Sequence, residues 1–539
     1  MDDVIRKWRL RSGWFPDESL TNGTISVKAE KITIVSAVLI LAVLALAMLA
    51  NSTTKALGRD EQMYCTAGIL LANGHHIYKD FSYVAQMPYH PLLYAGLYKI
   101  LGTTQYLLTG RIVSVVCDIL VMVLIVIIYR RAFGKFSATG TLFGLAGAIL
   151  YVFNPIVDYA NGYAWNNDVV SLCIVASFWL FVSTDFRHKV KYWRIGLIAA
   201  LLTFATFMRI TTALVILAFL VGFFIQLDVP AKRKFGIIAV FLCVSAVVSS
   251  WPIYMITKAP KAFLLNAVNI QTLNSQWLQK IGLFFSKPRL LYQCLTAPGY
   301  LSLILLGAYL WLTVVLLRRR QSTENSKAML LSGLLVLLFF IIALSLPTMW
   351  RQHLAAPVPF IIINLAYPAA FLRRLADTEG YRKYFNRVSL SMAGCAAIAV
   401  TAYPVVLDRI PQVFTVQNWV PVRLHKVSED IADKAGKDRP VLTLAPLWAL
   451  EGGCKIYNEL SAGPFVYRIA DFMTHTEREV TSTVAPSTIA ELIEKSPPAA
   501  VILGTEPKFI EKSLFNTLTR LDCKEHLYDE AGVQVYLVP

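Results

Sequence analysis

The chain has 539 residues, of which 56% are hydrophobic and only 16% are charged, and its mean hydropathy is +0.55. A soluble protein carries about a quarter charged residues, so the composition excludes an ordinary soluble enzyme. The formal net charge of +17 does not indicate a nucleic-acid partner, because the Lys and Arg residues gather in short connectors between apolar blocks.

Apolar blocks dominate the first three quarters of the chain. Most have roughly the 18 to 22 residues that a helix needs to cross a ~30 Å hydrocarbon core, and those at 138–153 and 195–208 are the shortest. The eleven blocks are 33–50, 107–129, 138–153, 167–184, 195–208, 210–227, 236–257, 299–317, 328–346, 354–371 and 388–407. The sequence predicts an α-helical polytopic membrane protein with about 11 transmembrane helices within residues 33–407.

The basic residues give this bundle an orientation. Every second short connector is rich in Lys and Arg, namely 130–136, 185–194, 230–235, 318–327 and 373–387. Such alternation is typical of connectors that remain on the cytoplasmic side. It predicts a cytoplasmic N-terminal segment (1–32), an uncleaved first span because no small-residue cleavage site follows it, and outer loops at 51–106 and 258–298.

Shorter patterns define the outer parts. Residues 63–74 and 90–102 have helical spacing but are too short to span, so we expect helices lying in the membrane interface. Beyond 408, strand-length apolar runs (439–450 and 499–506) alternate with helical patterns, which predicts a periplasmic α/β accessory domain over 408–539. Its cysteines, Cys454 and Cys523, could pair in an oxidising compartment, and spacing alone leaves that open.

The polar residues that are hard to explain as simple connector residues all fall on the predicted outer side. They are Asp60, Glu61, Asp158, Asp168, Arg209, Arg351 and His353. Charges at such depths are costly and are candidates for function. Carboxylates with separate cations suit transfer of a phosphate-linked sugar, because one carboxylate takes the proton from the attacking hydroxyl and cations hold the departing phosphate.

Each of these residues also has a purely structural interpretation. The pair Asp60–Glu61 can begin a helix, and Asp168 can cap the fourth span. Arg209 can snorkel to the interface, and residues 351–353 can anchor a helix end to lipid headgroups. His75, His76 and His90 lack the spacing of metal ligands, so no metal site or other cofactor is indicated, although a divalent metal stays possible.

The loop at 258–298 is basic and apolar. It contains five cations and no acidic residue: Lys258, Lys261, Lys280, Lys287 and Arg289. This composition fits a flap over a lipid-linked phosphate, and equally an interfacial helix that binds anionic headgroups.

The first outer loop carries a family resemblance. The stretch "GRDEQMYCTAGILLANGHHIYKDF" (58–81), followed by "MPYHPLLY" (87–94), resembles the GT-C superfamily of polyprenyl-phosphate-sugar-dependent glycosyltransferases. It is most similar to the bacterial branch of protein mannosyltransferase-like and lipid A aminoarabinose or galacturonic acid transferases. The segments "NPIVDYANGYAWNND" and "RQHLAAPVPF" extend the resemblance over about 33–371.

The resemblance implies an inverting transfer from a polyprenyl-phosphate sugar to a hydroxyl of a lipid or glycan at the outer face of a bacterial inner membrane. Asp60 would be the catalytic base. Substrate-binding residues would be Glu61, Tyr64, Tyr83, Asp158 and Asp168, and donor phosphate-binding residues would be Arg209, Lys258, Lys261, Arg351 and His353. The accessory domain would not supply catalytic groups. Gln62 and Met63 depart from the family pattern and leave the acceptor pocket undetermined.

Other functions remain open from the sequence. A protein O-glycosyltransferase of the same superfamily would share every motif named above. A lipid-linked-sugar flippase or transporter would normally show repeated halves and charged helices at the midplane, and the sequence shows no repeat. A glycan polymerase would place its functional arginines in one outer loop much larger than the loop at 258–298. A structural scaffold would have no need for ionisable residues gathered on one side of the membrane. The sugar, the acceptor and the oligomeric state are not predicted.

Overall fold

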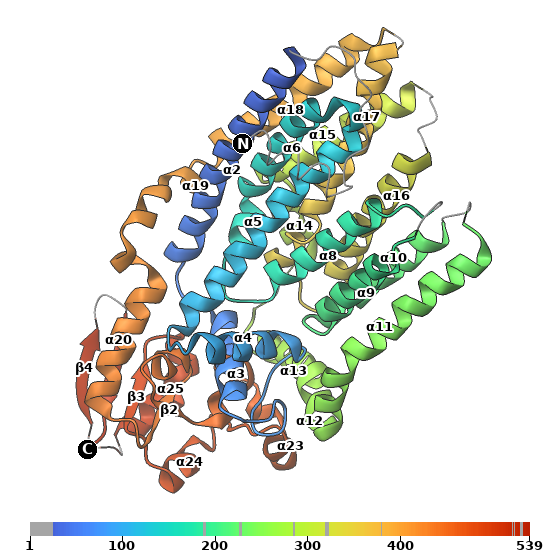
Figure 1. Cartoon of the computed structure of the whole chain (residues 1–539). Coiled ribbons are helices and arrows are strands. Elements are labelled where there is room, and N and C mark those ends of the chain that lie inside the picture. The colour runs from blue at the N-terminus through green and yellow to red at the C-terminus, as the bar shows by residue number, and fades with distance from the viewer. Residues whose placement is uncertain are drawn as a thin grey trace.

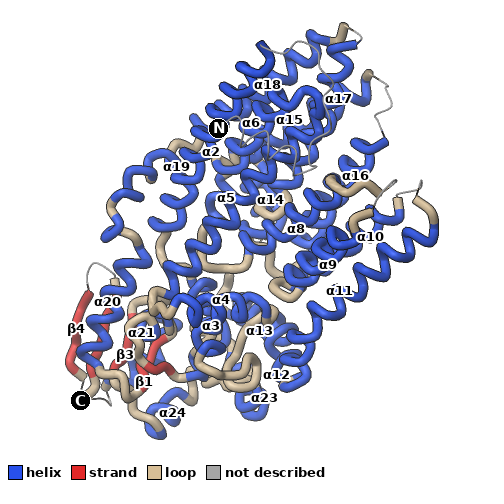
Figure 2. Tube along the Cα trace, viewed as in Figure 1, coloured by secondary structure: helices blue, strands red, loops and turns tan. Residues whose placement is uncertain are grey.

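A bundle of long helices carries a smaller α/β unit at one end (Figure 1). The computed structural model describes residues 25–186, 190–225, 229–283, 286–317, 323–378, 380–519, 521, 523–528 and 532–539. Most of the predicted N-terminal segment therefore lies outside the described residues. The smaller unit, here called the C-terminal unit, comprises residues 420–539 and holds all five strands of the described chain (Figure 2).

A helix forms at each of the eleven predicted apolar blocks. These helices are α2 (Ile25–Thr54), α5 (Tyr106–Phe133), α6 (Ser137–Val152), α8 (Asn167–Val182), α9 (Tyr192–Thr206), α10 (Ala213–Phe224), α11 (Ala231–Lys258), α15 (Pro298–Leu316), α16 (Thr323–Ser345), α17 (Val358–Thr378) and α18 (Arg382–Ala402). Among the described residues, seven helical stretches are long and apolar enough to cross a membrane, one of them joining α5 to α6. Helices α8, α9 and α10 are apolar but shorter.

The helices differ in how much of their surface is enclosed. The apolar stretch that includes α17 is 89% buried, whereas those of α2 and α18 are each 22% buried. Because lipid tails solvate an apolar face as well as protein does, such exposed faces are expected of helices at the rim of a membrane bundle. Helix α17 thus belongs to the core, and α2 and α18 border it.

Two helices of the first loop fill the space between the bundle and the C-terminal unit. They are α3 (Arg59–Ala72) and α4 (Tyr89–Leu101). Gly68 permits their close approach, since a Cβ there would lie 2.7 Å from the Cβ of Tyr94. All of residues 61–70 are buried. Protein therefore surrounds residues 61–70 of α3, whereas α4 has one buried face and an exposed end at 99–101. That the two helices lie at the membrane interface stays a prediction.

The remaining connections are short helical pieces. In the bundle these are η1 (Gly134–Phe136), α7 (Pro155–Ala160), η2 (Ile210–Thr212), α12 (Pro260–Leu264), the π-helical turn η3 (Leu265–Asn269), α13 (Ile270–Lys280), α14 (Lys287–Leu295) and η4 (Arg351–Leu354). The chain then reaches the C-terminal unit through α19 (Val405–Asp408), η5 (Ile410–Phe414) and η6 (Val416–Asn418).

The C-terminal unit is a mixed sheet with helices around it. The strands β1 (Pro440–Thr443), β2 (Lys455–Ile456), β3 (Ala500–Leu503), β4 (Lys524–Tyr528) and β5 (Val533–Leu537) follow the order β2-β1-β3-β5-β4. The first three run parallel, and β5 pairs antiparallel with both β3 and β4. Its helices are α20 (Val420–Ala435), α21 (Leu447–Leu450), η7 (Asn458–Leu460), α22 (Pro464–Tyr467), η8 (Ala470–Phe472), α23 (His475–Val480), α24 (Ile489–Lys495) and α25 (Lys508–Leu518).

The predicted run 499–506 contains β3, whereas of the run 439–450 only Pro440–Thr443 forms a strand (β1) and Leu447–Leu450 forms helix α21. Strands β2 and β4 carry no clear apolar run in the sequence. Cys454 and Cys523 form no disulfide within the described chain. The buried Cys454 thiol instead donates a weak hydrogen bond to the carbonyl of Gly436, with a sulfur–oxygen distance of 3.8 Å.

Candidate active site

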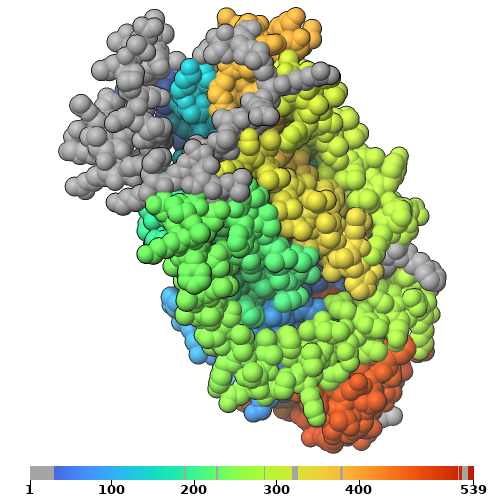
Figure 3. Space-filling model, turned by 90° about the vertical axis from the view of Figure 1, so that its right-hand side faces the viewer, coloured from blue at the N-terminus to red at the C-terminus, as the bar shows by residue number. Residues whose placement is uncertain are grey.

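A cavity of about 500 Å³ lies where the bundle meets the C-terminal unit. Its walls come from the first loop, the turn after α9, helix α13, the segment around η4 and helix α22. The loops that the sequence places on one side of the membrane therefore meet around one space. Figure 3 shows a recess between the green and yellow segments, with blue atoms from the early part of the chain at its floor.

Asp60 lies in the cavity wall, in the first turn of α3. Its carboxylate has no hydrogen-bond partner among the described residues. Tyr64 also lines the cavity. Because residues four apart share one face of a helix, the phenol lies beside the carboxylate. The two side chains present a proton acceptor and a hydroxyl to the same space.

Burial and the neighbouring cations shift the pKa of Asp60 in opposite directions. Removal from water raises the pKa of its carboxyl to about 6. Arg209 and Arg468 oppose that rise, and the carboxylate of Glu61 adds to it. A carboxyl with a pKa near 6 is ionised at neutral pH and is a stronger base than an ordinary aspartate.

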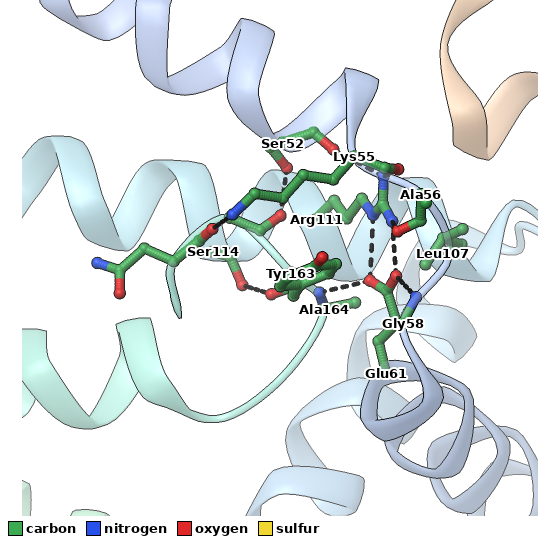
Figure 4. A network of polar contacts seen from close by, with 12 residues as sticks. Ser52, Lys55, Ala56, Gly58, Glu61, Leu107, Arg111, Ser114, Tyr163 and Ala164 are labelled. Atoms are coloured by element: carbon green, nitrogen blue, oxygen red, sulfur yellow. Dashed lines mark hydrogen bonds and ion pairs between the residues drawn. The ribbon is translucent and has the colours of Figure 1, made fainter. Parts of the chain in front are cut away.

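Glu61 also borders the cavity, but other groups hold its carboxylate (Figure 4). Arg111 of α5 donates from Nη2 to Oε1 (2.6 Å) and from Nε to Oε2 (3.1 Å). The backbone amides of Gly58 (2.7 Å) and Ala164 (3.0 Å) donate to the same carboxylate. Both members of the ion pair are fully buried. This pair ties the start of α3 to α5 and to the loop that contains Ala164.

Arg111 secures a third element as well. Its Nη1 donates to the carbonyls of Ser52 (2.7 Å) and Lys55 (2.9 Å), and its Nη2 donates to that of Ala56 (3.2 Å). These carbonyls belong to the end of α2 and the residues after it, where helical carbonyls lack partners within the helix. Arg111 therefore fastens both the end of α2 and Glu61, the residue after Asp60, to α5.

Two further groups from the bundle reach the cavity. Arg209 stands in extended backbone just before η2, and its guanidinium has no hydrogen-bond acceptor in the described part of the chain. Burial lowers its pKa, while Tyr64 and Asp60 act in the opposite direction. His353 of η4 lines the same wall, and its Nδ1 accepts a hydrogen bond from the amide of Trp350 (3.1 Å).

Asp158 and Asp168 do not line the cavity. The carboxylate of Asp158 accepts hydrogen bonds from Arg409 (3.0 and 3.1 Å) and from the hydroxyl of Tyr403 (2.8 Å). The carboxylate of Asp168 lies in the first turn of α8 and accepts from the amide of Gly162 (3.2 Å). In this structure both residues fasten a loop next to the site.

The other predicted site residues also lie outside the cavity wall. Tyr83 is buried and packs edge-on against Tyr64, with ring centroids 6.0 Å apart. Arg351 lies 6.0 Å from the ring centre of Tyr159, which does line the cavity. Lys258 and Lys261 are exposed.

Sequence reasoning missed two arginines. Arg111 lies inside an apolar block, and a charge within a span was a signal that could have found it. Arg468 comes from the C-terminal unit and lines the cavity opposite the bundle. No local pattern distinguishes Arg468 from other arginines of the tail. The tail, which the resemblance implies supplies no catalytic group, thus contributes a charged side chain to the cavity wall.

The three loop histidines do not form a metal site. Within the described ranges, no group of three or more His, Cys, Asp or Glu side chains is placed to hold a metal ion. His90 is buried between the rings of Tyr64 and Tyr94, with centroid distances of 4.7 and 4.3 Å. Burial lowers its pKa to about 3, so its role is that of a neutral packing group.

Comparison with known proteins gives one family and one fold. The family described as dolichyl-phosphate-mannose-protein mannosyltransferase matches residues 85–254, which is less than half of the chain. Among curated proteins, no sequence matches. The family match and the fold described below both agree with the resemblance to the GT-C superfamily that the first loop carries.

The fold is similar to that of ArnT from Cupriavidus metallidurans. The crystal structure of ArnT bound to undecaprenyl phosphate matches with a TM-score of 0.61 and 13% identity, over 93% of this chain and 97% of that chain. The apo structure gives a TM-score of 0.59 over the same shares, also at 13% identity. The oligosaccharyltransferase of Archaeoglobus fulgidus, at 13% identity, has a TM-score of only 0.47 over 86% of this chain and 69% of that chain.

Proposed function

We propose that the protein is an inverting glycosyltransferase that moves a sugar from a polyprenyl-phosphate-linked donor to a hydroxyl of a lipid or glycan. The observation that carries this proposal is the contrast between two adjacent carboxylates. Glu61 is fully hydrogen-bonded, whereas Asp60 is unpaired among the described residues and faces a cavity that also contains Arg209. An unpaired carboxylate beside an unpaired cation suits proton removal next to phosphate binding.

In the proposed reaction, Asp60 takes the proton of the acceptor hydroxyl as its oxygen attacks the anomeric carbon. The bond between that carbon and the phosphate oxygen breaks on the opposite face, and its electron pair leaves with the polyprenyl phosphate. The configuration of the sugar is therefore inverted. The phosphate is a stable anion, so the site needs cations at the leaving group rather than a general acid.

Arg209 and His353 are the proposed partners of the donor phosphate, Arg209 as the cation and His353 as a neutral imidazole, because burial and Arg209 lower the pKa of His353 to about 3. Both come from the bundle, where a lipid-linked donor must lie, and both line the cavity. Lys258, Lys261 and Arg351 lie outside the cavity wall, so we assign them at most a part in guiding the donor. Tyr64 shares a helix face with Asp60 and is the proposed hydroxyl contact to the sugar. Glu61, Asp158, Asp168 and Tyr83 hold the walls in place.

The fold supports a lipid-linked donor. ArnT, which shares the fold over nearly its whole length, has been crystallised with undecaprenyl phosphate. The cavity of about 500 Å³ has room for a sugar and a phosphate but not for a polyprenyl chain. The chain of the donor would therefore remain in the membrane beside the bundle. This arrangement fits a multi-pass protein of the inner membrane with a cytoplasmic N-terminus and a periplasmic C-terminal unit.

The test is transfer by purified protein in lipid, supplied with labelled polyprenyl-phosphate sugars and either an envelope-lipid extract or an acceptor peptide. We expect label to move from the donor to a lipid product. Asp60→Asn should lower the rate about 10²–10⁴-fold while donor still binds. Transfer that survives this substitution would refute the role of Asp60. Label on the peptide alone would assign the acceptor to protein, and donor translocation without transfer would indicate a flippase.

A further inference from the structure

Four charged groups alternate in sign between the first loop and the C-terminal unit. Arg59, immediately before Asp60, donates from Nε to Oε1 of Glu506 with a distance of 2.7 Å. These two residues lie 447 positions apart in the sequence. Arg468 interacts electrostatically with Arg59, with Glu506 and with Asp60. The carboxylate that faces the cavity is thus linked through charges to the unit at the end of the chain.

Arg468 is aimed at the cavity by its surroundings. It follows α22, and Gly463 before that helix has φ +57, where a Cβ would lie 2.6 Å from the carbonyl oxygen of Leu444. The guanidinium donates to Oδ1 of Asn274 (2.6 Å) and lies 4.6 Å from the ring centre of Trp277. Both partners belong to α13, so α13 and α22 together fix the side chain.

The guanidinium still has capacity for a further partner. Its Nε is buried and has no hydrogen-bond partner among the described residues. Arg468 is also the only charged residue of the described C-terminal unit that lines the cavity, where Phe465 accompanies it. It faces Asp60 from the C-terminal unit, whereas Arg209 belongs to the bundle. A cation held this firmly beside an unpaired carboxylate stabilises negative charge there without reorganising.

We infer that the C-terminal unit completes the active site, and that Arg468, which lines the same cavity as Asp60, is a positioning residue that keeps the Asp60 carboxylate ionised for proton removal. The inference rests on the proposed function of Asp60. The charges that face Asp60 are Arg209 from the bundle, Arg468 from the C-terminal unit, and its own neighbours Arg59 and Glu61. Arg468 is the one among them that belongs to the C-terminal unit, and Arg59 is held by Glu506 of the same unit.

The charge of Arg468 determines in which direction it shifts the pKa of Asp60. A nearby cation favours the ionised carboxylate, so Arg468 lowers the pKa of Asp60 below the value that burial alone would give. Removal of the cation raises that pKa. Asp60 is then ionised only at higher pH, and the acidic limb of the pH–rate profile moves to higher pH. A purely structural role for Arg468 would lower the amount of folded enzyme without moving the limb.

The experiment measures kcat/KM for sugar transfer against pH in the full-length protein. Arg468→Met keeps an unbranched chain to pack on Trp277 but removes the charge, and Arg468→Gln is a second neutral variant. We expect both to shift the acidic limb upward by about one pH unit. Arg468→Lys should keep the limb of the wild type. Arg423→Gln is the matched control, because Arg423 is exposed on α20 of the same unit.

The outcomes separate the two proposals. Absence of transfer by the wild type would refute the proposed function itself. Active wild type with unmoved limbs in both neutral variants would refute the inference about Arg468. Loss of folding in both neutral variants, with an active Lys variant of unchanged profile, would assign Arg468 a structural role and would also overturn the inference.

Discussion

Asp60 and Glu61 are adjacent in the sequence, but Glu61 is bound by Arg111 at 2.6 Å whereas Asp60 faces the cavity. Successive residues of an α-helix point about 100° apart, so Glu61 can turn toward Arg111 while Asp60 faces the cavity. The buried pair fixes the helix that presents Asp60. The two acids therefore have distinct, complementary tasks.

Replacement of Glu61 should destabilise the fold. Glu61→Gln leaves the fully buried Arg111 without its counter-charge, and loss of one partner of a buried pair costs about 3–5 kcal/mol. We expect a clearly lower thermal-unfolding midpoint in detergent. The exposed Glu491 provides the control variant Glu491→Gln. A stable Glu61→Gln protein that merely loses affinity for sugar would contradict this interpretation and restore a direct substrate role.

The rate of transfer should depend on pH through Asp60. Its pKa is raised to about 6, and the base must be ionised to act, so kcat/KM should be constant above about pH 7 and fall as pH drops through 6. The measurement is a rate profile between about pH 5 and 9 with acceptor in excess. An acidic limb near pH 4 would mean that an unburied carboxylate is the base.

Arg209 should govern donor binding. Arg209→Gln removes the unpaired cation of the bundle wall, and we expect KM for the donor to rise roughly 10–100-fold, equivalent to about 1.4–2.8 kcal/mol. Arg209→Lys should recover part of that loss. Titration of the lipid-linked donor gives the result directly. If Arg209 only snorkels to headgroups, the donor KM will not change in either variant.

Asp158 should matter for stability rather than chemistry. Arg409 bridges Asp158 and the side chain of Asn51 (2.8 Å), so it fastens the connection to the C-terminal unit onto α2. Asp158→Asn should cost about 1–3 kcal/mol, the range for hydrogen bonds to charged groups. Thermal unfolding would show the loss, with Lys426→Gln, an exposed change on α20, as control. A variant of normal stability and lowered turnover would argue for a substrate role.

The helices of the bundle could be predicted because their signal is local. Continuous apolar blocks must satisfy their own backbone hydrogen bonds in lipid, so even the short segment at 195–208 forms α9 (Tyr192–Thr206). The strand β3 at Ala500–Leu503 is likewise an apolar run. Strand β2 contains two residues and owes its existence to pairing with β1, which no local pattern reveals.

The site could be predicted only in part, because its decisive contacts are long-range. The motif around Asp60 and the position of Arg209 beside a span were visible in the sequence. Which of the two adjacent carboxylates is free depends on Arg111, which lies 50 positions away. Asp158, like Asp60, is an acidic residue in a predicted outer loop beside a span, but its partner Arg409 lies 251 positions away. Residue type cannot show which carboxylate is paired.

The last wall of the cavity comes from Phe465 and Arg468, near the end of the chain, while Asp60 lies near its beginning. A ribosome-bound chain that has inserted all of its spans therefore still lacks an intact cavity. The cavity is complete only after the C-terminal unit has been translated and has folded against α3. A nascent chain would thus be unable to catalyse the proposed transfer until its C-terminal unit has docked.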